Sequence, residues 1–157
     1  MLLIRIMTHT YRTHYYHLIW STKNREKWIT PEIQNNLYLY IGGIMRNNHN
    51  CVLLGIGGIS DHVHLLMSLS LPDKFTQVVR DVKANSSLWI HKNYPQSNLF
   101  AWQEGYASYS VSYSSVEKVL NYINNQEEHH KKTTFDEEYV LLLRKCQIEY
   151  DEEYVLG

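Results

Sequence analysis

The chain is organised around one ten-residue stretch, Asp61-His62-Val63-His64-Leu65-Leu66-Met67-Ser68-Leu69-Ser70. Side chains of a β-strand alternate between two faces, and here every second residue is apolar: Val63, Leu65, Met67 and Leu69. His62 and His64 would then share the opposite face. Their backbones would lie roughly 6.5 to 7 Å apart, which allows both imidazoles to bind one metal ion. A His-x-His pattern is weak by itself in a chain with nine histidines, so its meaning depends on the surrounding sequence.

Length and composition indicate one globular domain spanning residues 1–157. The chain has 44% hydrophobic and 20% charged residues, as soluble domains do. Its two cysteines, Cys51 and Cys146, are too few for a disulfide framework and are expected to be reduced thiols in a cytoplasmic protein. No uninterrupted apolar run approaches the roughly 18 residues of a membrane span, so we expect no membrane partner.

Charge is distributed unevenly along the chain. The net charge is −1, but residues 126–157 hold nine acids and four Lys or Arg, against seven acids and 11 Lys or Arg in residues 1–125. An acidic end therefore masks a mildly basic body. The early cationic side chains are compatible with phosphate binding and equally with a solvated surface: Arg5, Arg12, Lys23, Arg25 and Lys27.

Two strands and a helix are expected before the histidine strand. Residues 15–22 are rich in aromatic and β-branched side chains and predict a strand. Thr30-Pro31-Glu32 begins a helix, with a capping hydroxyl and a proline in the first turn, and Asn47 to Asn50 end it. Residues 51–59 are apolar throughout and predict a central strand, in which Gly57 and Gly58 indicate a bulge or a close backbone approach. Ser60-Asp61 would then turn the chain into a hairpin.

The remaining segments complete a recognisable order of elements. We expect a helix over residues 74–92, one or two short strands over 100–112, a third helix that begins after Ser114 or Ser115, and a last helix over 136–145. Tyr122 and Gln126 are four residues apart and would share one face of the third helix. The order predicts an α+β, ferredoxin-like (split βαβ) fold, an antiparallel sheet with helices packed on it and extra C-terminal helices.

Several motifs in sequence order resemble one family, the single-tyrosine HUH transposases of the insertion-sequence 200/605 group, which includes those associated with repetitive extragenic palindromes. The motifs cover most of residues 14–155 and leave 1–11 as an unassigned N-terminal extension. They are residues 17–25 (HLIWSTKNR), 57–66 (GGISDHVHLL), 102–106 (WQEGY), 110–112 (SVS), 119–130 (VLNYINNQEEHH) and 149–154 (EYDEEY).

The resemblance implies a role for four residues and a partner for the chain. Tyr122 would be the catalytic nucleophile, and His62, His64 and Gln126 would bind a divalent metal ion, Mg²⁺ or Mn²⁺. The substrate would be a single-stranded DNA hairpin, cleaved and rejoined through a 5′-phosphotyrosine intermediate. A homodimer is expected, with an active site assembled either within one subunit or between two.

Residue patterns alone leave other functions open. A ferredoxin-like domain often binds nucleic acid without catalysis, and the same histidines would also suit a Zn²⁺ hydrolase that activates water. A binding module would leave the DNA intact, whereas a hydrolase would cut it without becoming linked to it. Under the family resemblance, the hairpin would be held partly by basic residues such as Arg25 and Lys83.

Overall fold

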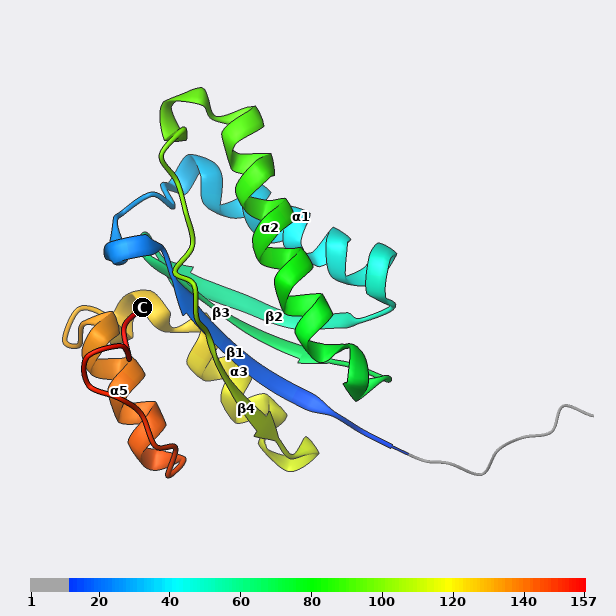
Figure 1. Ribbon diagram of the computed structural model, residues 1–157. Helices are drawn as coiled ribbons and strands as arrows, with labels where there is room; N and C mark the ends of the chain where they lie inside the picture. The colour runs from blue at the N-terminus through cyan, green and yellow to red at the C-terminus, as the bar shows by residue number, and fades with distance from the viewer. Residues whose placement is uncertain (1–11) are drawn as a thin grey trace, which may run out of the picture.

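The computed structural model describes residues 12–157 and places four antiparallel strands in one sheet, in the order β2-β3-β1-β4. The N-terminal extension 1–11 lies outside the described residues. The strands are β1 (Tyr15–Ser21), β2 (Val52–Ile59), β3 (His62–Ser68) and β4 (Ala107–Val111). Figure 1 shows this sheet crossing the molecule, with helices packed on it. The predicted ferredoxin-like α+β fold is therefore confirmed.

Two long helices cover one face of the sheet. These are α1 (Pro31–His49) and α2 (Phe75–Asn93), both on the same side in Figure 1. They bury the apolar face predicted for the histidine strand, together with Leu18 and Trp20 of β1, in the larger core cluster. Short 3₁₀ turns join the elements: η1 (Lys23–Arg25), η2 (Pro72–Lys74), η3 (Pro95–Ser97) and η4 (Tyr113–Ser115).

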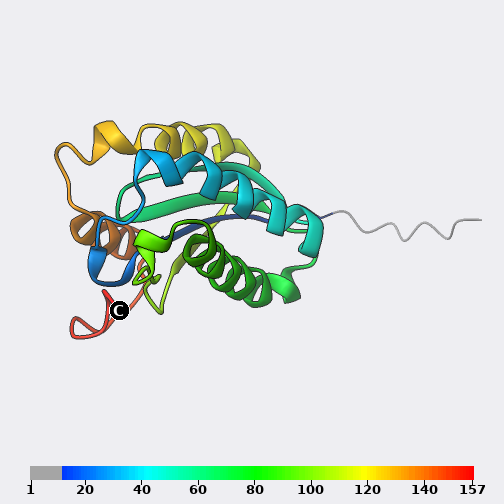
Figure 2. The same ribbon diagram turned by 90° about the horizontal axis from the view of Figure 1, so that it is seen from above.

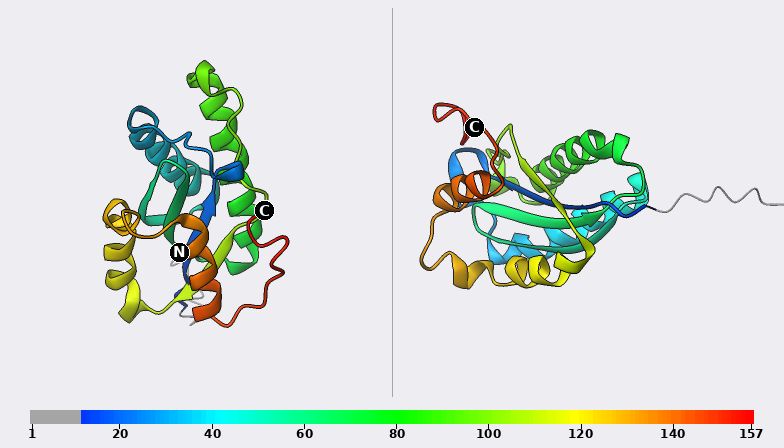
Figure 3. Two further views of the ribbon diagram at one scale, coloured as in Figure 1. Left: turned by 90° about the vertical axis from the view of Figure 1, so that its left-hand side faces the viewer. Right: turned by 90° about the horizontal axis from the view of Figure 1, so that it is seen from below.

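The opposite face carries the C-terminal helices α3 (Val116–Asn124), α4 (Gln126–His129) and α5 (Phe135–Lys145). Figure 2 shows α3 and α5 separated across the width of the sheet. Figure 3 shows that the segment between these helices passes around one end of the sheet. Phe135, Tyr139 and Leu143 of α5 pack with Ile19 and Ala107 in a second, smaller apolar cluster. This cluster fixes α5 over β1 and β4.

Three local predictions need correction. β2 is an edge strand rather than a central one, and its apolar sequence is only partly covered, since Val52 is 57% and Leu54 38% exposed. The Thr30 side chain makes no capping hydrogen bond. The third helix ends at Asn124, so Gln126 begins α4 instead of sharing one continuous helix with Tyr122. Within residues 12–157, no helix is both long and apolar enough to cross a bilayer.

Candidate metal centre and active site

His62 and His64 lie on the face of β3 that meets the C-terminal helices. Both imidazoles are fully buried, and β1 and β2 flank them, with Ile19 and Gly57 paired to His64. A Cβ atom placed on Gly57 would lie 2.3 Å from the Ile123 carbonyl oxygen of α3. The close backbone approach predicted at the glycines is confirmed, and it holds α3 directly against the strand beside the histidines.

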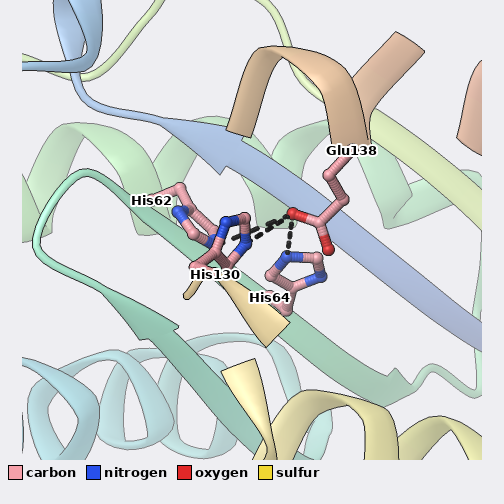
Figure 4. Close-up of side chains that lie close together, drawn as sticks. All are labelled: His62, His64, His130 and Glu138. Atoms are coloured by element: carbon pink, nitrogen blue, oxygen red, sulfur yellow. Dashed lines mark hydrogen bonds and ion pairs between the residues drawn. The ribbon is translucent and has the colours of Figure 1, made fainter. Parts of the chain in front are cut away.

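Four side chains converge on one point beneath the sheet. The donor atoms of His62, His64, His130 and Glu138 all lie within 4.8 Å of one another. Figure 4 shows the three imidazoles turned toward the Glu138 carboxylate, with the two strand histidines on one side and the helix α5 that carries Glu138 on the other. Glu138 Oε2 lies 2.9 Å from His130 Nε2 and 3.3 Å from His64 Nε2. The Gln126 amide oxygen adds a fifth donor, 2.9 Å from His62 Nε2.

Outer hydrogen bonds decide which imidazole nitrogens face this point. His62 Nδ1 lies 2.6 Å from the Asp61 carboxylate, and His130 Nδ1 lies 2.6 Å from the Thr133 carbonyl oxygen. Both partners are acceptors, so each Nδ1 carries a proton and the Nε2 of each ring faces the cluster. There His62 Nε2 lies 2.9 Å from the Gln126 amide oxygen, and His130 Nε2 lies 2.9 Å from Glu138 Oε2. A proton on Nε2 or a metal ion between the ring and the oxygen would satisfy each contact.

The charges in the cluster also favour a bound cation. Burial lowers the pKa of His64 to about 4 and that of neighbouring His17 to about 3, so both rings are neutral at pH 7. Burial opposes ionisation of Glu138, yet hydrogen bonds from His130 and His64 hold the pKa of this carboxyl well below its usual range. The buried carboxylate therefore stays negative. Burial opposes protonation of His130, but hydrogen bonding to Glu138 raises the pKa of this histidine, so the carboxylate is balanced either by protonated His130 or by a divalent metal ion, which the donor set suits.

Tyr122 enters the same cluster from α3. Its hydroxyl donates to Glu138 Oε1 and lies 3.4 Å from His129 Nε2, and its ring centroid is 5.7 Å from that of His64. Burial, together with the adjacent carboxylate of Glu138, raises the pKa of Tyr122 well above its usual value. A cavity of about 490 Å³ opens beside the ring and is lined by Tyr122, His129 and Lys132. One chain therefore brings a tyrosine, the histidine pair and Gln126 together, next to an open pocket.

The two cations chosen from the sequence lie away from this cluster. Arg25 pairs with Asp136 at 3.2 Å and donates to the Leu156 carbonyl oxygen. The Lys83 ammonium donates to the carbonyl oxygens of Gln103, Glu104 and Gly105 at 2.7 to 2.9 Å. Burial lowers the pKa of Lys83 to about 8. DNA contact by either residue stays a prediction, and both side chains already hold segments of the fold together.

Sequence reasoning assigned no role to His130 or Glu138. His130 follows Gln126 by four residues, a spacing that helical geometry could have flagged. Glu138 offered no such signal, since it is one of three acids in the first turn of α5 and the only buried one. Its burial depends on the packing of α5 against the sheet, which no local pattern shows.

Comparison with known proteins identifies the family of the chain. The family model described as "Transposase IS200 like" matches residues 10–126, about three quarters of the chain. The ISDra2 transposase TnpA of Deinococcus radiodurans is 28% identical over 118 residues, which are 71% of this chain and 82% of that protein.

Two solved structures share the fold. A protein of Deinococcus radiodurans R1 has a TM-score of 0.58 at 22% identity, over 75% of this chain and 94% of that one. The REP-associated tyrosine transposase bound to a REP hairpin has a TM-score of 0.59 at 12% identity, over 74% of this chain and 68% of that one. His62, His64, Tyr122 and Gln126 all lie within the matched residues 10–126, and the chain belongs to the IS200-like transposase family.

Proposed function

We propose that this chain cleaves and rejoins single-stranded DNA at hairpin-bearing element ends, with Tyr122 as the nucleophile. One observation carries the proposal: the Tyr122 ring lies 5.7 Å from the ring of buried His64 of its own chain and lines an open pocket. Family membership supplies the transposase activity. The residues that perform the chemistry are our assignment.

The metal ligands proposed from the resemblance fit the donor set. His62, His64 and Gln126 present two inward nitrogens and one amide oxygen, and Asp61 fixes the tautomer of the first histidine. These residues would hold Mg²⁺ or Mn²⁺. Such an ion would neutralise charge on the nonbridging oxygens of the scissile phosphate. The protein's own contribution is a buried, preorganised set of ligands next to the nucleophile.

Tyr122 forms the covalent bond. Its phenolic oxygen attacks phosphorus, the bond between phosphorus and the 3′ oxygen breaks, and the departing oxygen takes a proton to become a free 3′-OH. The 5′ phosphate stays linked to the tyrosine. A phenol with a pKa near 10 is only about 0.1% ionised at pH 7, and burial beside Glu138 raises the Tyr122 pKa further. Attack must therefore be coupled to loss of the phenolic proton.

A tyrosine nucleophile suits strand exchange better than water does. The phosphodiester energy is conserved in the protein–DNA bond, so a 3′-OH can attack that bond and rejoin DNA without ATP. A hairpin is the first substrate to test, because a neighbour of the same fold is described with a REP hairpin bound. Lys132, on the rim of the pocket beside Tyr122, is positioned to contact a phosphate of the incoming strand.

We further propose that each active site is complete within one subunit, although a homodimer stays our prediction. Mixing Tyr122→Phe protein with His64→Ala protein distinguishes the two arrangements. A site shared between subunits would regain activity in mixed dimers, because one site would contain both intact residues. Our proposal predicts that the activity of the mixture does not exceed the summed activities of the two variants measured separately.

The direct test uses end-labelled single-stranded DNA from the flanks of the gene, incubated with Mn²⁺ or EDTA and separated by denaturing electrophoresis. A labelled band at protein size should form only with metal. Tyr122→Phe should abolish it, while Tyr113→Phe, which changes a tyrosine that is 77% exposed, should leave it intact. Cleavage without a protein-linked band would favour the hydrolase, and binding without cleavage would favour the non-catalytic DNA-binding protein.

A further inference from the structure

We propose that His130 and Glu138 are ligands of the catalytic metal ion, so that the segment after the family-matched residues completes the metal site. Both residues lie beyond residue 126, where the match to the family model ends. The inference rests on the proposed function, since it adds ligands to the same site. It also makes binding of the ion depend on α5.

The spacing of the donor atoms is that of ligands around one ion. Two ligands that each lie about 2.1 Å from a metal at right angles are about 3 Å apart. His130 Nε2 is 2.9 Å from Glu138 Oε2 and 3.0 Å from the Gln126 amide oxygen. The corresponding distances from Glu138 Oε2 to the strand histidines are 3.3 Å to His64 and 3.9 Å to His62.

His130 has the outer partner expected of a metal ligand. Ligating histidines donate their second ring N–H to a carboxylate or a backbone carbonyl, which directs the other nitrogen to the ion. His130 does so through the Thr133 carbonyl, as His62 does through Asp61. The neighbouring His129 differs, since its Nε2 faces the Tyr122 hydroxyl and Glu138 Oε1 at 3.4 and 3.5 Å, and it lies outside the four-residue cluster.

Glu138 links the ion to the nucleophile. Its Oε2 faces the histidines, while its Oε1 accepts a hydrogen bond from the Tyr122 hydroxyl. A carboxylate held between metal and phenol would orient the hydroxyl whenever the site is loaded. Because Glu138 is on α5, loading the site would also tie this helix to the sheet beyond what its apolar cluster achieves.

The donor set further defines the class of ion. Three imidazoles with one carboxylate suit Mn²⁺ and later transition metals, whereas Mg²⁺ prefers sites made of oxygen ligands. With His62, His64 and Gln126 alone the site would hold only two nitrogens. We therefore expect the full chain to bind Mn²⁺ at least tenfold more tightly than Mg²⁺.

The first experiment measures Mn²⁺ affinity of the DNA-free full chain by titration calorimetry. Glu138→Gln and His130→Asn should each weaken binding at least tenfold, as should His64→Ala. A matched control, Glu127→Gln, removes an exposed carboxylate next to Gln126 and should bind like the wild type.

A second experiment on the wild-type chain avoids any variant that fails to fold. Hydrogen exchange of the α5 amides should slow when Mn²⁺ is added, because a ligand on that helix makes its local opening compete with metal binding. Together, weakened binding in both variants and slower exchange in α5 are the expected results.

Other outcomes separate this inference from the proposed function. Wild-type affinity in folded Glu138→Gln and His130→Asn, or unchanged α5 exchange at saturating Mn²⁺, would overturn the added ligands and leave His62, His64 and Gln126 as the site. Unchanged affinity in His64→Ala, or no Mn²⁺ binding by the wild type, would refute the metal role altogether.

Discussion

Gly57→Ala should slow DNA cleavage by displacing the helix that carries the nucleophile. The new Cβ would lie 2.3 Å from the Ile123 carbonyl oxygen, and ordinary contact begins at 3.4 Å. The strand and helix must therefore separate by about 1 Å. The obstacle is backbone, which no rotamer change can move aside. Tyr122 precedes Ile123 and would shift with it.

The expected loss of rate follows from that displacement. A misplacement of 1 Å at a reacting group costs on the order of 10²-fold in rate, equivalent to about 2.7 kcal/mol of activation free energy. Overpacking should also lower the free energy of unfolding, by about 1 to 3 kcal/mol. The histidines remain on β3, so hairpin affinity should change far less than the rate, whereas Gln126, three residues after Ile123, would shift with the helix and weaken Mn²⁺ binding.

The assay is the single-turnover rate of covalent adduct formation at saturating Mn²⁺ and hairpin DNA, after thermal denaturation has confirmed a folded protein. Two alanine variants serve as controls. At Gly55 the Cβ would meet only the Leu120 side chain, which can change rotamer to move its Cδ2 away. The adduct-formation rate of Gly55→Ala should therefore fall less than tenfold. At Gly43 of α1 a Cβ would meet nothing within 4 Å beyond its own helix backbone, so Gly43→Ala should keep the rate and stabilise the helix by about 1 kcal/mol.

The order of the three variants tests the reasoning. A folded Gly57→Ala protein that forms adducts at the wild-type rate would show that the position of α3 does not control the nucleophile. A rate loss as large in Gly55→Ala as in Gly57→Ala would show that helix displacement by backbone contact is not the cause.

Three further predictions concern stability and accessibility. Thr134→Ala should lower the free energy of unfolding by about 1 kcal/mol in denaturant titrations, because Thr134 and Glu137 form a reciprocal capping box at the start of α5; an unchanged midpoint would contradict this. Lys83→Met should increase proteolysis of the 101–106 segment more than it weakens DNA binding, since the ammonium bonds three of its carbonyl oxygens; a purely DNA-binding defect would reverse that order. Burial raises the pKa of the Cys51 thiol to about 11, so a thiol reagent at pH 8 should label exposed Cys146 in the native protein and reach Cys51 only on unfolding.

Sequence reasoning identified the histidine strand and most helix boundaries because those signals are local. Apolar residues alternate along 62–69, which predicts one strand face that packs into the core and another that carries both imidazoles. The structure shows both faces. The fold class followed from the order of elements. The position of β2 did not, since strand order depends on pairing between distant segments, and an apolar run does not distinguish an edge strand from a central one.

The sequence by itself determined that His62 and His64 share one strand face and that Tyr122 lies four residues before Gln126. Tertiary structure decided what surrounds them. The chain reverses after α4, and the apolar side of α5 packs on β1 and β4. This packing brings Glu138 to His64, which lies 74 residues earlier in the sequence, and to His130, which lies eight residues earlier. Periodicity reports only which face of an element is apolar. Which polar side chains meet beneath the sheet depends on where that face is buried.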